Sequence, residues 1–268
     1  MTIDVIVNAD DFGLCREISA GIVRAYEKGI VTSTSVVVNG AYFREGVSLL
    51  RSCGIDAGVH LTITGREAPV SGVVGGLVDS AGLFLRSYRE VVPRIVLGRF
   101  DRDALRRELY AQVAMAEDSG IPISHIDSHQ HLHLLPGIRD IVVELAQRFR
   151  IRWVRVPLAH GPGPRGLMMN VLASGLRSRL KAHGLAFTDR FRGFEHGGHL
   201  AFARLSSLVR RLGHGITELM VHPGYDASAV YDWGYAWEDE LAALTSQDIR
   251  TMMQKVGIRL TNFKEITI

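Results

Sequence analysis

The sequence predicts an α/β protein built as an irregular, TIM-like (β/α) barrel of about seven strands. Three observations lead to this fold class. Short β-branched runs alternate with amphipathic stretches along the chain, a pattern typical of parallel strands joined by crossover helices. The length of 268 residues suits an α/β barrel, which takes about 250 residues. The first strand is followed by no glycine-rich phosphate-binding motif, which disfavours an open nucleotide-binding sheet.

The expected strands are short apolar runs that fit buried positions in a parallel sheet. They cover residues 3–7, 34–38, 57–61, 124–126, 153–156, 219–221 and 258–260. Since no internal repeat or linker divides the chain, we expect residues 1–268 to form a single domain.

Helical periodicity predicts four helical regions between these strands. They cover residues 18–26 before Gly29, 105–116 between an Asp101 cap and Gly120, 138–149 after Pro136, and 241–256 with a break near Thr245. Residues 70–85 and 157–181 fit the alternation poorly. We expect both to be long loops at strand ends, where barrel proteins build their binding surfaces.

Composition excludes several classes of protein. The chain is 47% hydrophobic with a net charge of +3, which excludes disorder. Its two cysteines, Cys15 and Cys53, are unclustered and fit a reducing compartment. Without a membrane-spanning run or a leader pattern, we expect a cytoplasmic protein. The basic residues are dispersed, so we expect no nucleic-acid partner. Nothing in the patterning indicates an oligomeric state.

Histidines concentrate in one segment, since four of the 11 lie between His125 and His133. Strand side chains alternate between faces, so His125, Asp127 and His129 point the same way. His131 has the same parity and lies beyond the expected strand end. Because a strand that buries several ionisable groups must satisfy them with a metal, a partner or water, this segment predicts a functional site.

Other strands end in similar residues. Asp10 and Asp11 follow the first strand and His60 ends the third. One aspartate and two histidines from three strand ends form a three-ligand set typical of a catalytic divalent metal site, with Zn²⁺ or Mg²⁺ as the ion and imidazole favouring transition metals. A carboxylate such as Asp127 would fix a histidine tautomer.

Two further strand ends carry candidate residues. His222 follows the run at 219–221, where a general acid could stand. Arg155 could hold a carboxylate.

Five ordered motifs together resemble the YdjC/ChbG family of carbohydrate deacetylases, which are related to polysaccharide deacetylases. These motifs are Asn8-Ala9-Asp10-Asp11-Phe12-Gly13 and residues 29–34, 58–62, 125–129 and 221–224. The resemblance implies a distorted (β/α) barrel in which Asp11, His60 and His129 hold one divalent metal ion. It also implies that Asp10 is the general base and His222 the acid. Gln130 stands where the family often has histidine, on the opposite strand parity from His129.

Within this family the chain looks most like the hopanoid-biosynthesis-associated, HpnK-type branch, through Arg155-Val156-Pro157 and residues 194–198. That branch implies an N-acetylglucosaminyl hopanoid as substrate and a place at the inner membrane face. Residues 70–85, and 167–172 with the following Arg177, Arg179 and Lys181, are the candidate lipid or membrane contacts, since apolar residues beside basic ones suit a lipid–water interface.

The predicted activity is hydrolysis of the linear amide C–N bond of an N-acetylated amino sugar, with metal-activated water as the nucleophile. His125, Asp127, Arg155 and His131 are expected to support the ligands or contact substrate. Three alternatives stay open: a deacetylase of soluble chitooligosaccharides, a metal-dependent phosphoesterase with a second ion, and a sugar or lipid binder without activity. The intact Asp10-Asp11 pair disfavours the binder, which has no use for a base beside a ligand.

Overall fold

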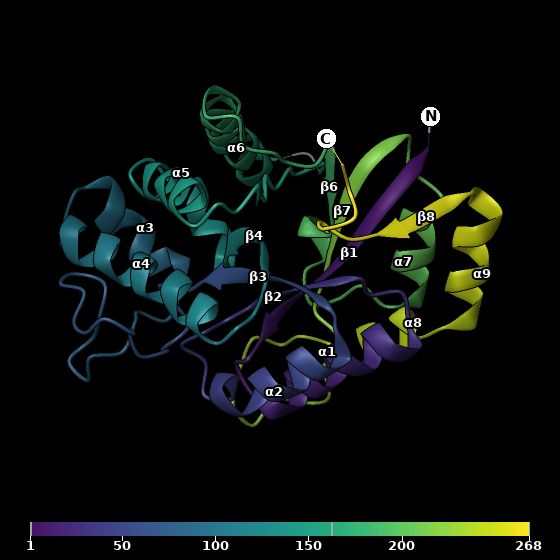
Figure 1. Cartoon of the computed structure of the whole chain (residues 1–268), viewed down its shortest axis with the longest axis horizontal. Coiled ribbons are helices and arrows are strands. Elements are labelled where there is room, and N and C mark those ends of the chain that lie inside the picture. The colour runs from purple at the N-terminus through teal and green to yellow at the C-terminus, as the bar shows by residue number, and fades with distance from the viewer. Residues whose placement is uncertain (1, 162, 268) are drawn as a thin grey trace.

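The computed structural model describes residues 2–161 and 163–267 and shows one curled, parallel sheet (Figure 1). Within these residues the sheet has eight strands, in the order β5-β4-β3-β2-β1-β7-β6, with β8 paired to β1. Their bounds are β1 Ile3–Phe12, β2 Ser33–Val36, β3 Asp56–Leu61, β4 Ile123–Ser128, β5 Trp153–Val154, β6 Arg190–Arg192, β7 Gly215–Val221 and β8 Ile258–Thr261.

The first strand is the centre of this sheet. Residues 3–9 of β1 pair with β7, residues 3–6 pair with β8, and residues 8–12 pair with β2, all in parallel. Among the described residues no pairing joins β5 to β6, so the seven-strand path curls into a half-barrel without closing. The predicted α/β barrel of about seven parallel strands is therefore confirmed in its class, with an open wall between β5 and β6.

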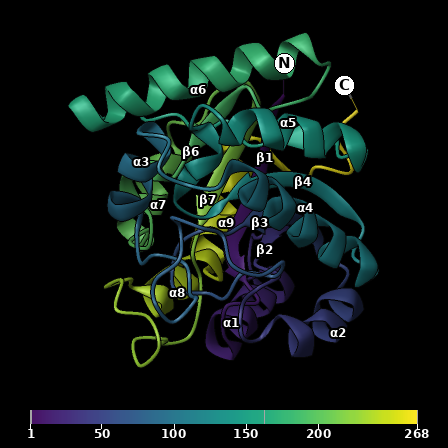
Figure 2. The same cartoon turned by 90° about the vertical axis from the view of Figure 1, so that its left-hand side faces the viewer.

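Helices surround the sheet (Figure 2). Their bounds are α1 Arg16–Lys28, α2 Phe43–Cys53, α3 Tyr88–Val96, α4 Arg102–Asp118, α5 Ile138–Arg148, α6 Pro164–Ala182, α7 Phe202–Val209, α8 Trp237–Leu244 and α9 Gln247–Val256, with 3₁₀ turns η1 His129–Leu134 and η2 Phe194–His196. The four predicted helical regions are confirmed as α1, α4, α5 and the pair α8–α9. The Asp101 side chain caps α4 by accepting from Ala104 N at 2.9 Å.

The prediction of a loop over residues 157–181 was wrong, because α6 occupies most of this segment and packs beside α5 (Figure 2). Pro164 stands in the first turn of the helix, where a missing N–H costs nothing. One face of α6 buries Ala173, Leu176 and Leu180. The loop predicted over residues 70–85 is confirmed, since no helix or named strand falls there.

The sheet places the polar strand ends together. Parallel strands bring their carboxyl ends to one end of the half-barrel. The ends of β1, β3, β4 and β7 there carry buried polar residues, and polar side chains such as Asn8, His125 and Glu218 are also buried within the strands, beside apolar ones such as Val5 and Val59. In the described part of the chain, no helix is long and apolar enough to cross a membrane.

Candidate active site

The end of β1 brings two consecutive carboxylates to the same site. In a regular strand Asp10 and Asp11 would point to opposite faces. The β1–β2 register shifts between Ala9 and Phe12, and Asp11 has a left-handed backbone with φ of 76°. A bulge of this kind redirects a side chain, and such backbone strain gathers at functional sites. Both carboxylates are buried at the carboxyl end of the sheet.

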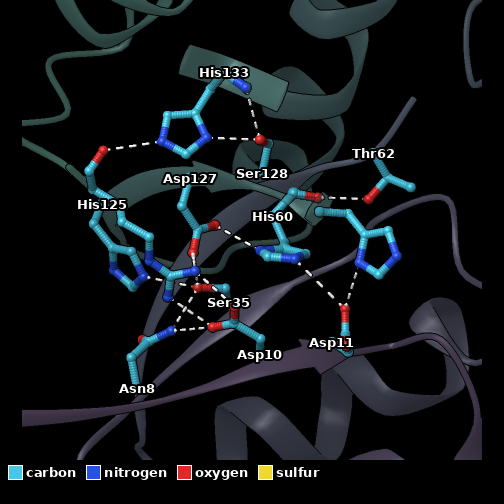
Figure 3. A network of polar contacts seen from close by, with 12 residues as sticks. Asn8, Asp10, Asp11, Ser35, His60, Thr62, His125, Asp127, Ser128 and His133 are labelled. Carbon is cyan, nitrogen blue, oxygen red and sulfur yellow. Dashed lines mark hydrogen bonds and ion pairs between the residues drawn. The ribbon is translucent and has the colours of Figure 1, made fainter. Parts of the chain in front are cut away.

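Asp11 lies at the centre of a carboxylate–histidine cluster with His60 and His129, and Figure 3 shows it beside His60. Its Oδ1 is 3.5 Å from His60 Nε2 and 3.0 Å from His129 Nδ1. In a tetrahedral site with bonds of about 2.1 Å, neighbouring ligand atoms lie about 3.4 Å apart. The two distances bracket that separation. The donor set of one carboxylate and two imidazoles therefore fits a divalent ion.

The charges of this cluster favour an ionised carboxylate. Burial opposes ionisation of Asp11, but the nearby His129 and His60 hold its pKa well below the usual range. Burial also lowers the pKa of His60, yet the carboxylates of Asp127, Asp10 and Asp11 outweigh it and raise that pKa to about 9. The carboxylates of the cluster therefore favour a positive charge beside them even when no cation is bound, as the donors of a metal site do.

Asp127 orients His60. Its Oδ1 lies 2.8 Å from His60 Nδ1, which leaves the opposite ring nitrogen directed toward Asp11 (Figure 3). Its Oδ2 accepts from the Ser35 hydroxyl at 2.8 Å and lies 2.6 Å from Arg155. A carboxylate that holds the far nitrogen of a ligand histidine fixes its tautomer.

A fully buried arginine connects the carboxylates behind the cluster. The Arg155 guanidinium binds both oxygens of Asp10, at 2.6 and 2.7 Å, and Nε donates to Glu218 at 2.6 Å. Asn8 also donates to Asp10, at 2.8 Å. Burial opposes the charge on Arg155, but Asp10, Asp127 and Glu218 hold its pKa well above the usual range. These contacts fix the Asp10 carboxylate in one orientation.

A second group of possible ligands consists of Asp10, His60 and Asp127. It shares His60 with the first cluster. Arg155 Nη1 lies 2.6 Å from an oxygen of Asp10 and 2.6 Å from one of Asp127. Since the guanidinium already occupies an oxygen of each carboxylate, this group disfavours a second cation.

His125 and His133, in the same segment, have both ring nitrogens engaged in buried hydrogen bonds. His125 places its ring nitrogens against Ser124 and Ser35 and stacks on Phe263. It reaches Asp127 only through the Ser35 hydroxyl. His133 contacts Ser128 and donates to the Arg155 carbonyl. Burial lowers the pKa of both histidines to about 4. Their engaged nitrogens do not provide ligands for a further ion.

The alternation of side chains between the two faces of the sheet stops at Ser128, where β4 ends. Gln130 and His131 both adopt left-handed backbone in η1. The Gln130 side chain accepts from Tyr88 N at 2.6 Å and so holds the start of α3. The His131 ring lies against Phe191 and Phe194. Burial holds its pKa well below the usual range.

His222 follows β7 at the same end of the sheet. Its backbone N–H donates to the buried Glu240 at 2.6 Å, and its ring packs edge-on against Tyr235, with centroids 5.1 Å apart. His222 Nδ1 has no hydrogen-bond partner among the described residues. An imidazole with a free nitrogen can carry a proton to a reacting group.

One feature of the site was missed by the sequence analysis. The loop between β7 and α8 and the first residue of α8 carry aromatic residues at every second position, namely Tyr231, Trp233 and Tyr235 in the loop and Trp237 in the helix. Trp233 contacts the His129 ring, with centroids 5.2 Å apart. The spacing was visible in the sequence, but no strand or helix was expected there to give it meaning.

The fold and this cluster define a class: a parallel α/β half-barrel with a candidate divalent-metal site at the carboxyl ends of its strands. The sequence model of the YdjC-like protein family matches residues 4–255, and the chain belongs to that family.

Carbohydrate deacetylases from other organisms match over nearly the whole chain. A human carbohydrate deacetylase is 32% identical over 289 residues, covering 96% of this chain and 88% of the human protein. A carbohydrate deacetylase from Brevibacillus brevis is 30% identical over 267 residues, covering 98% of this chain and 99% of the bacterial protein. A solved structure from Enterococcus faecalis, described provisionally as a cellobiose-phosphate cleavage protein, covers all of both chains with a TM-score of 0.80 and 24% identity. That similarity supports the fold.

Proposed function

We propose that this protein is a metal-dependent hydrolase that removes the N-acetyl group from an N-acetylglucosamine-type sugar. The observation that carries the proposal is the Asp11–His60–His129 cluster, with Asp10 beside it and His222 at the same sheet end, in a chain whose relatives are carbohydrate deacetylases. The named relatives support a hydrolytic deacetylase. The cluster supports a single divalent ion, Zn²⁺ or Mg²⁺, held by Asp11, His60 and His129.

A divalent ion held by these donors supplies Lewis acidity toward the acetamide carbonyl and toward water. Asp10 accepts the proton of the attacking water as its oxygen bonds to the carbonyl carbon. Arg155 and Asn8 keep the Asp10 carboxylate in place during this transfer, so the base needs no reorganisation before reaction.

His222, which follows the carboxyl end of β7, is the proposed general acid. The carbon–nitrogen bond breaks as His222 donates a proton to the departing nitrogen, and the products are acetate and a free amino sugar. The buried Glu240 holds the His222 backbone, and Tyr235 limits the movement of its ring. These contacts leave His222 Nδ1 without a hydrogen-bond partner among the described residues.

We further propose a lipid-linked substrate, an N-acetylglucosaminyl hopanoid. Arg165, in the first turn of α6, lies over the rings of Tyr88 and Phe194 beside η1, the turn that begins at His129. The next residues on α6 expose Leu167, Met168 and Val171, each more than half exposed. Leu172, expected beside them, packs partly against the core instead. An apolar helix face next to the site suits a lipid aglycone or a membrane surface.

Acetate release by metal-loaded protein tests these proposals. The substrates are N-acetylglucosamine, N,N′-diacetylchitobiose and an N-acetylglucosaminyl lipid, each with and without chelator. Chelator-sensitive release from the lipid alone supports the hopanoid substrate. Release from chitobiose at a similar rate supports soluble chitooligosaccharides instead. No acetate from any substrate, with metal bound, contradicts the deacetylase proposal, and phosphate esters are then the next substrates.

Liposome co-sedimentation tests the membrane contact separately. The triple variant Leu167→Gln, Met168→Gln, Val171→Gln should lose binding to liposomes. Val256→Gln, which changes an exposed residue at the end of α9, should bind as the wild type does. Equal sedimentation of the triple variant and the wild type contradicts peripheral attachment through α6.

A further inference from the structure

The aromatic residues of the β7–α8 loop form a continuous row between two functional side chains. Ring centroids are 4.5 Å apart for Tyr231 and Trp233, and 5.4 Å apart for Trp233 and Tyr235. One part of the row contacts His129 through Trp233, and another contacts His222 through Tyr235. The row therefore borders the space between the candidate metal ligands and the candidate acid.

Contacts made by the residues before and after Trp233 in the sequence hold the row in place. The Tyr231 hydroxyl donates to Glu67 at 3.1 Å, and Asp232 pairs with Arg86, so two residues are tied to the loop after β3. On the other side, Ala236 N donates to the Gly198 carbonyl at 2.7 Å. Tyr235 lies against Gly198 so closely that a Cβ there would overlap its ring. The row is thus a preformed surface.

Trp233 differs from the other two tryptophans of the chain. Trp153 and Trp237 are buried, with 2% and 3% exposure, whereas Trp233 is only partly buried. A tryptophan that packs only to fill the core would be expected to bury both ring faces. Preformed ligand sites commonly combine such aromatic surfaces with a few polar groups.

We infer that Trp233 is the platform on which the sugar ring carrying the acetamido group stacks during deacetylation. This inference rests on the proposed function. The C–H face of a pyranose is apolar, and a flat aromatic ring can cover it without leaving sugar hydroxyls unpaired. Contact between Trp233 and His129 would then set the distance between the bound ring and the metal ligands. Trp233 is a specificity-determining residue, because a substrate without the ring gains nothing from it.

The steady-state kinetics of Trp233→Ala test the inference. The substrate is N,N′-diacetylchitobiose, or the N-acetylglucosaminyl lipid if the wild type deacetylates only the lipid. We expect kcat/KM to fall at least ten-fold, mainly through KM, and Trp233→Phe to restore most of it. Activity on N-acetylethanolamine, which carries the acetamide without a ring, should fall less than activity on the sugar. Tyr225→Ala is the matched control, since Tyr225 is an exposed aromatic residue of the same loop with 43% exposure. Elemental analysis checks that each variant keeps its metal.

Fluorescence provides a readout that does not need turnover. In chelator-treated wild-type protein, added diacetylchitobiose should change the tryptophan emission, and Trp233→Phe should abolish that change while calorimetry still detects binding. Wild-type kcat/KM in Trp233→Ala, or an equal loss on N-acetylethanolamine, would overturn the platform. A wild-type protein that releases no acetate would instead refute the proposed function, so the two failures are distinguishable.

Discussion

Replacing Arg155 with lysine should weaken both the fold and the proposed catalysis. Four contacts of 2.6–2.7 Å join the guanidinium to Asp10, Asp127 and Glu218. An ammonium keeps the charge but lacks the planar fork, and we expect it to keep two of the four. At about 1.5–3 kcal/mol for each lost charge-assisted contact, the predicted loss of unfolding free energy is about 3–6 kcal/mol.

Urea unfolding of chelator-treated protein measures this loss without a contribution from bound metal. The matched control is Arg259→Lys, because Arg259 makes one 2.6 Å contact with Asp4 and its side chain is 60% exposed. An exposed pair of this kind contributes about 0–1 kcal/mol. We also expect Arg155→Lys to lower kcat, since Asp10 loses its bidentate partner. If both variants lose less than about 1 kcal/mol, the buried network does not hold the site together.

Three further variants test separate parts of the site. Asp10→Asn should keep the metal and lower kcat at least about 100-fold, the contribution typical of a general base; unchanged turnover would exclude Asp10 from that role. His129→Ala should lower the metal content measured by elemental analysis, and a full ion per chain would contradict ligation by His129. Burial raises the pKa of Glu218 from 4.5 to about 7, so its contribution to stability is complete below pH 4.5 and is lost as the pH rises through about 7. The Tm of metal-free wild type should therefore fall more between about pH 5 and 8 than that of Glu218→Gln, and parallel Tm curves would contradict the raised pKa.

Much of the fold could be predicted because its signals are local. Each of the seven predicted strands overlaps a strand of the structure, although those at 34–38 and 153–156 run two residues past β2 and β5, and apolar periodicity located α1, α4 and α5. The shared carboxyl edge of parallel strands then explains why Asp11, His60 and His129, far apart in sequence, meet in one cluster. Alternation of side chains also explains why His125 and Asp127 both reach Ser35.

Other features depend on tertiary contacts that a sequence pattern does not contain. Strand β6 has only three residues and is recognised by its pairing with β7. The turn residues from Gly161 onward suggested a loop, yet Leu176 and Leu180 give α6 a buried face. The shared site of Asp10 and Asp11 requires a register shift and a left-handed residue. Periodicity alone assigns those two side chains to opposite faces.

The most direct test of the account is a metal titration of activity. Protein freed of metal by chelation is titrated with Zn²⁺, and in parallel with Mg²⁺, while acetate release from the best substrate of the panel is followed. Because Arg155 stands between Asp10 and Asp127, the account predicts activity that rises linearly and saturates at one ion per chain. Saturation at two ions, or acetate release that survives complete chelation, would contradict the single site formed by Asp11, His60 and His129.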